Sequence, residues 1–142
     1  MMSDDSRAAV HKSFWVIGAF ALVWNGLGSV NYLIQVTAES LDAYRAVEQA
    51  IIADRPAWAT GAFAVGVFGG TVGAVLLLLG KSVAFHVFIV SLIGVVVFTV
   101  HTLSLGLDFG IGEMVVIVAM PTVVGLLFAW YAKYAEGKGW VS

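Results

Sequence analysis

The stretch from Trp58 to Lys81, WATGAFAVGVFGGTVGAVLLLLGK, decides the class of this protein. Its first 22 residues, through Leu79, carry no charge. At about 1.5 Å per residue, a helix of this length crosses a bilayer core of about 30 Å. The stretch therefore predicts a transmembrane helix.

Small residues recur at every fourth position of this predicted helix. They leave one helix face almost free of side chains, and such a face lets a second helix approach closely. We expect this face to be the centre of helix packing, whereas Leu77 should face lipid. The four small positions are Ala62, Gly66, Gly70 and Ala74.

The composition of the whole chain favours the same class. Hydrophobic residues make up 61% of the 142 residues and charged residues only 11%, against about a quarter charged in a soluble domain. The length leaves room for one domain, residues 1–142. The absence of cysteine excludes disulfides and thiolate metal sites, and a net charge of −2 gives no reason to expect nucleic acid as a partner.

Three further apolar segments complete an all-α, integral membrane four-helix bundle. Only Gly80 to Ser82 separate the second and third spans, so these spans form an antiparallel hairpin. For the first span, a cleaved signal peptide with a processing site at Val36 to Ala38 is the alternative. The predicted spans are 14–35, 58–79, 83–103 and 114–134, and Pro121 should free a carbonyl group within the last of them.

The only long hydrophilic stretch lies between the first two spans. Its apolar residues Leu41, Tyr44, Val47 and Ile51 fall near one face of a helix. With Thr37 as N-cap, the pattern predicts an amphipathic helix over 38–53 that lies on the membrane or caps the bundle. A solvated helical loop is the alternative.

The distribution of basic residues predicts the orientation. Lys and Arg gather on the cytoplasmic side of membrane proteins. Two of the seven, Arg45 and Arg55, lie between the first two spans, on the side opposite the others. Both termini should therefore be cytoplasmic, with the other five basic residues beside them: Arg7, Lys12, Lys81, Lys133 and Lys138.

The first span reads W-N-x-x-G-x-x-x-Y-x-x-Q, from Trp24 to Gln35, and is followed by Pro56-Ala57-Trp58, by FAVGVFGG and by a basic turn. In these motifs the chain resembles a group of small four-span bacterial inner-membrane proteins, some of which are labelled sugar transporters. The resemblance implies a four-span fold and a place in the bacterial inner membrane. It implies no activity.

Polar residues within the spans are the candidate site. With the orientation above, they gather in the outer leaflet and predict a polar pocket that opens outward, with Val95 too deep to take part. The alternative is that they join helices by hydrogen bonds, at about 0.6 to 2 kcal/mol each. The candidates are Asn25, Asn31, Tyr32 and Gln35 of the first span and Thr99 and His101 of the third.

No chemical motif accompanies these residues. His86 and His101 are 15 residues apart on one predicted helix, about 22 Å, so they cannot share a metal ion, and we expect no metal, cofactor or enzymatic activity. The first function to consider is an accessory or scaffold protein that binds a second copy or another membrane protein through small-residue faces. The alternative is a small-solute transporter or channel component. An exposed small-residue stripe would favour the first, and a cavity lined by Asn25 and His101 the second.

Overall fold

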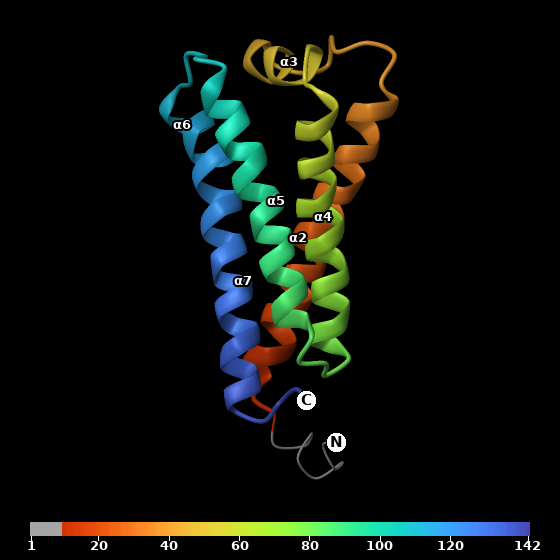
Figure 1. Cartoon of the computed structure of the whole chain (residues 1–142), viewed down its shortest axis with the longest axis vertical. Helices are drawn as coiled ribbons and strands as arrows, with labels where there is room; N and C mark the ends of the chain where they lie inside the picture. The colour runs from red at the N-terminus through yellow and green to blue at the C-terminus, as the bar shows by residue number, and fades with distance from the viewer. Residues whose placement is uncertain (1–9) are drawn as a thin grey trace.

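The computed structural model describes residues 10–142, and within this range the chain is helical and contains no strand. Figure 1 shows long helices running side by side between the two ends of the molecule, with one short helix across the upper end. The elements are α2 (Lys12–Thr37), α3 (Ala46–Ala53), α4 (Ala57–Leu78), α5 (Ala84–Ser104), α6 (Ile111–Met114), the π-helical turn η1 (Val115–Ala119) and α7 (Met120–Gly137).

The predicted fold is confirmed. Four helical segments are long and apolar enough to cross a membrane: α2, α4, α5 and the continuous helix formed by α6, η1 and α7. The largest differences between predicted and observed limits are three residues, at both ends of the fourth span, predicted at 114–134 and observed from Ile111 to Gly137. The protein is an all-α four-helix membrane bundle.

The central helix of the bundle is α4, which packs against both α2 and α5. All four positions of its small-residue face are buried. Gly70 lies against Asn25 of α2, and the carbonyl oxygen of Gly66 accepts a hydrogen bond from Ser91 Oγ of α5. The small residues therefore bring three helices of one chain together.

Leu77 does not face lipid as expected, because it is 1% exposed. It follows Ala74 by three residues and so continues the same buried face of α4. Here it joins a core formed by α2, α5 and α7, which includes Phe14, Phe88 and Phe128. The core occupies the lower half of the bundle in Figure 1, which we call the closed end.

The last residues of the chain dock on the closed end. Ser142 N donates to Gly80 O at 3.0 Å, and Ser82 N donates to Ser142 O at 3.1 Å. Between these bonds and α7, Val141 is 4% exposed and belongs to the core. The turn between α4 and α5 is thus fixed by the end of the chain.

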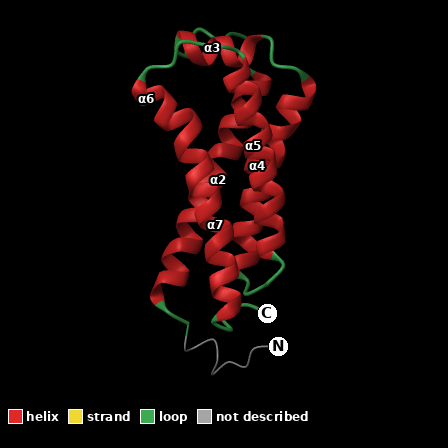
Figure 2. Ribbon diagram, turned by 60° about the vertical axis from the view of Figure 1, so that its left-hand side comes forward, coloured by secondary structure: helices red, strands yellow, loops and turns green. Residues whose placement is uncertain are grey.

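At the opposite end, which we call the α3 end, the fourth span leaves the bundle. At the closed end α2 and α7 are in contact, because Ser13 Oγ and Tyr131 Oη are 3.0 Å apart and the rings of Phe20 and Phe128 are 5.8 Å apart. Figures 1 and 2 show α6 and the end of α2 on opposite sides at the top. Accordingly, no residue in 111–127 is buried.

The helix across the α3 end is shorter than the predicted 38–53. It covers only Ala46–Ala53 and begins after Arg45. Thr37 is not its N-cap but the last residue of α2, where Thr37 Oγ1 donates to Leu33 O at 2.6 Å. The following segment turns instead of coiling, because Ser40 Oγ accepts a hydrogen bond from Asp42 N at 3.1 Å and such local bonds compete with a helix.

A π-helical turn precedes Pro121 in the fourth span. Proline has no N–H to donate and its ring displaces the preceding turn, and a wider turn is one way for a helix to absorb that change. Thr122 Oγ1 donates to Val118 O at 3.0 Å, so a side chain satisfies a carbonyl group next to the wide turn. The helix continues through the proline.

Candidate functional site

The helices enclose a cavity of about 500 Å³ in the half of the bundle nearest the α3 end. Its size lies within the range of about 300–1,000 Å³ that small-molecule sites occupy. Five helices, α2, α3, α4, α5 and α7, and the turn η1 contribute lining residues. The space between them exists because the fourth span diverges from α2 above the closed end. The cavity therefore results from the separation of the fourth span from α2 in this half of the bundle.

The floor of the cavity lies where the core begins. Phe88 and Phe128 line it, and their ring centres are 5.9 Å apart. Asn25 also lies there at 8% exposure, and its Nδ2 donates to Ala21 O of its own helix at 2.8 Å. The amide of Asn25 is thus held by α2 itself, and it does not hydrogen-bond another helix within residues 10–142.

The walls above the floor are mainly apolar. They are formed by Val95 and Phe98 of α5 and by Ile117 of η1, among others. Two lining residues also face the outside of the bundle, Leu27 at 66% and Val116 at 56% exposure. The cavity therefore has an opening between α2 and η1, on the surface that faces lipid.

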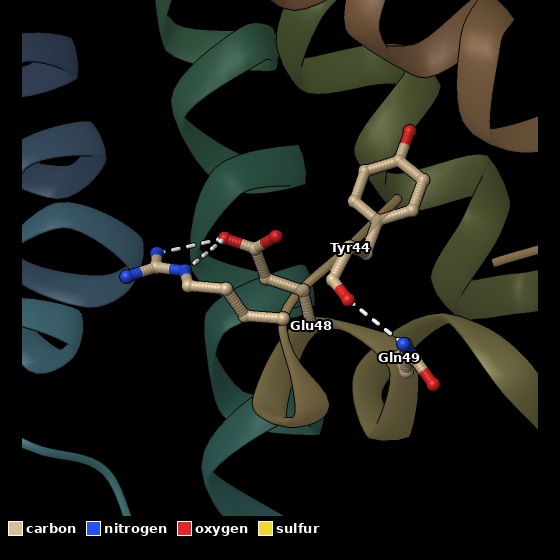
Figure 3. A network of polar contacts seen from close by, with 4 residues as sticks. Tyr44, Glu48 and Gln49 are labelled. Atoms are coloured by element: carbon tan, nitrogen blue, oxygen red, sulfur yellow. Dashed lines mark hydrogen bonds and ion pairs between the residues drawn. The ribbon is translucent and has the colours of Figure 1, made fainter. Parts of the chain in front are cut away.

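Helix α3 covers the cavity at the α3 end. Figure 3 shows a contact within the segment that begins this helix, where Gln49 Nε2 donates to Tyr44 O at 2.8 Å. In the same segment, Arg45 Nη2 forms an ion pair with Glu48 Oε1 at 2.8 Å. The hydrogen bond to Glu48 raises the pKa of Arg45. Glu48 also lines the cavity, whereas its counter-ion Arg45 lies outside the lining with a side chain that is 63% exposed.

Arg55 reaches the cavity from the connection between α3 and α4. Its Nη1 donates to Gln35 Oε1 at 3.0 Å, and its Nε donates to Thr60 Oγ1 at 3.1 Å. Its guanidinium carbon lies 5.1 Å from the ring centre of Phe63 and 5.7 Å from that of Phe98. Burial lowers the pKa of Arg55, but arginine stays charged in proteins.

The predicted site residues divide into two groups. Tyr32 and His101 lie outside the cavity. The ring of Tyr32 sits 5.4 Å from the rings of both Phe63 and Phe68, and His101 lies edge-on to Trp58 at 5.1 Å. The residues that the structure brings together around the cavity are Asn25, Asn31, Gln35 and Thr99.

Several cavity residues did not follow from the sequence. Val95 was expected below the pocket but lines it, because the cavity reaches down to Phe88, nearly two turns deeper on α5. From the sequence, Arg55 was used only to predict the orientation of the protein in the membrane. A signal for its role was present: Pro56 disfavours helical backbone at Arg55, which leaves this side chain at a chain reversal directly above a span.

The four apolar spans make this chain a multi-pass membrane protein with a cavity among its helices. Comparison of the sequence with known protein families, with curated proteins and with solved structures finds no match. The resemblance to small four-span bacterial inner-membrane proteins therefore stays a prediction.

Proposed function

We propose that this chain is a non-enzymatic membrane protein that binds a small ligand in the cavity, as a component of a small-solute transport system. The observation that carries the proposal is the cavity of about 500 Å³, which opens at one side and ends on a packed core. A largely apolar cavity with a few converging polar groups is typical of a ligand site.

The location of the small residues supports this proposal over a scaffold that associates through them. Ala62, Gly66, Gly70 and Ala74 are buried between helices of the same chain. A methyl group on Gly94 of α5 would fall 2.7 Å from Ala62 O, so α5 already occupies this face. The stripe is not free for a partner.

The closed end favours binding over conduction by a single copy. Phe14, Leu77 and Tyr131 are buried there, and the docked chain end lies beside them. A solute that enters the cavity therefore meets a packed core rather than a path. Transport would require a partner or a second conformation.

We further propose the bacterial inner membrane as the location, with both termini cytoplasmic. Ser142, where Figure 1 marks the C-terminus, lies at the closed end, and Val10, the first described residue, packs against the core there. Basic residues on the same side support this orientation through the positive-inside rule. They are Lys12, Lys81, Lys133 and Lys138, while Arg7 of the predicted set lies outside the described residues.

Thiol labelling tests the ligand site, because the protein has no cysteine of its own. Thr99→Cys places a thiol in the cavity, and Val100→Cys places one on the neighbouring surface, where Val100 is 62% exposed towards lipid. The reagent reacts with the cysteine thiolate, which forms only where water reaches the side chain. We expect labelling at position 99 of the purified, delipidated chain in detergent and none at 100. Protection of both positions would contradict the proposal.

A second function is supported by the fourth span. None of its residues in 111–127 is buried, so this segment offers a long surface to another membrane protein, as the accessory role requires. Val123→Cys, at a position 62% exposed, would then form a disulfide between copies or with a partner on oxidation. Val72→Cys, at a position 52% exposed on α4, is the control. Cross-linking at 123 alone would favour this function.

A further inference from the structure

Arg55 is a half-buried cation without an acidic partner among the described residues. The ion pairs among residues 10–142 are Arg45 with Glu48 and Lys133 with Glu136, and neither involves Arg55. The carboxylate of Glu48, which lines the cavity, is already paired with Arg45 at 2.8 Å. Removing a charge from water is costly unless another group compensates it. An anion in the cavity would supply that compensation.

The guanidinium of Arg55 is fixed in position and keeps a free donor for such an anion. Neutral acceptors on Gln35 and Thr60 take Nη1 and Nε, while the rings of Phe63 and Phe98 lie beside the charge. Among the described residues, Nη2 has no hydrogen-bond partner. A fixed guanidinium with free N–H groups is the geometry that binds carboxylate and phosphate oxygens.

Below Arg55 the cavity suits a hydrocarbon chain. It extends along α2 from Gln35 to Asn25, a distance of about 15 Å and thus about the thickness of one leaflet of a 30 Å bilayer core. A cavity of about 150 Å³ holds one benzene molecule, so the present volume of about 500 Å³ holds roughly 20 carbon atoms, which is one long acyl chain. The side opening between Leu27 and Val116 connects it with lipid.

We propose that the cavity binds a lipid with one acyl chain and an anionic head group, with the head at Arg55 and the chain directed towards Phe88 and Phe128. This proposal rests on the proposed ligand-binding function and names its ligand class. A soluble anion would leave the apolar depth unused, and an uncharged amphiphile would leave Arg55 uncompensated.

Native mass spectrometry of the full chain in a neutral detergent tests the proposal. The probes are dodecyl phosphate and dodecanol, which share a chain and differ in charge. We expect one bound dodecyl phosphate, with at least about tenfold preference over dodecanol, because hydrogen bonds to charged groups are worth about this factor or more. A large excess of inorganic phosphate should not displace the amphiphile. Displacement would overturn the acyl-chain part of the proposal.

Variants locate the head group. Arg55→Gln keeps hydrogen-bonding capacity and should lose the preference for dodecyl phosphate, whereas Arg55→Lys should keep part of it. Lys81→Gln removes a cation at the closed end and should change nothing. Size-exclusion chromatography shows whether each variant is folded. An unchanged preference in Arg55→Gln would overturn the proposal.

Ile117→Trp separates the two proposals, because it fills the cavity from η1, which contains no buried residue. We expect this variant to lose both probes. If the unmodified chain binds both probes equally and Ile117→Trp blocks both, the cavity binds ligands but the anionic class is wrong. If Ile117→Trp blocks neither, the ligand-binding function itself is wrong.

Discussion

Asn25 of α2 lies directly against Gly70 of α4, so closely that a methyl group on the glycine would overlap the side-chain amide. The same asparagine forms part of the cavity floor. The absence of a side chain at position 70 therefore determines both how closely two helices approach and how deep the cavity is. Contact between α2 and α4 and formation of the cavity depend on each other at this point.

Gly70→Leu should destabilise the protein by at least about 2 kcal/mol, because an added side chain in a packed interior forces the neighbours apart. Val72→Leu is the matched control, since Val72 lies two residues further on α4 and is 52% exposed. Thermal aggregation of both purified variants in one detergent measures the difference. Equal midpoints would mean that α2 and α4 do not pack through Gly70.

Tyr32 should contribute packing and not ligand binding. Its ring lies between Phe63 and Phe68, 5.4 Å from each, and its hydroxyl forms no hydrogen bond within residues 10–142. Tyr32→Ala should lower stability by about 2 kcal/mol, while Tyr32→Phe should leave the melting temperature unchanged. Cysteine labelling at position 99 should be the same in Tyr32→Phe as in the parent. Reduced labelling would place Tyr32 at the cavity.

Val141→Asp should unfold the closed end. Val141 is 4% exposed within the core, and a buried carboxylate without a partner is strongly unfavourable. Ser142→Asp introduces the same charge at the exposed neighbour and should have little effect on thermal stability. Comparable melting temperatures for the two variants would show that the chain end does not dock.

The orientation can be measured with two cysteines at exposed positions. Asp42→Cys, between α2 and α3, should react with an impermeant thiol reagent added to intact cells, because this segment lies on the side with few basic residues. Lys138→Cys should react only after the cells are permeabilised. The reverse result would mean that the termini face outward.

The spans could be predicted because an uncharged run of about 20 residues has one stable form in a bilayer, a helix that satisfies its own backbone. The cavity could not be predicted. It exists because α6 and η1 diverge from α2, whereas α7 stays in contact with Phe20 and Ser13, about 100 residues earlier in the chain. No local pattern encodes such a distance.

The positions of individual side chains could be predicted where they depend on one helix and not where they depend on a neighbouring helix. Helical spacing placed Asn25, Asn31 and Gln35 on the cavity side of α2, because angular position on a helix follows from residue number. Spacing placed Tyr32 with them, yet the rings of Phe63 and Phe68 draw it towards α4. Where a side chain lies between two faces, the neighbouring helix decides, and a single sequence does not show that neighbour.

The buried residues of α7 all follow Leu127, in the part of the helix at the closed end. The segment before them, 111–127, contains no fully buried residue, and its contact with the core begins at Val124. Val116 and Ile117, which line the cavity, precede Val124 by about two turns. A change in the width of the lateral opening would therefore act on a part of the fourth span that carries no core contact.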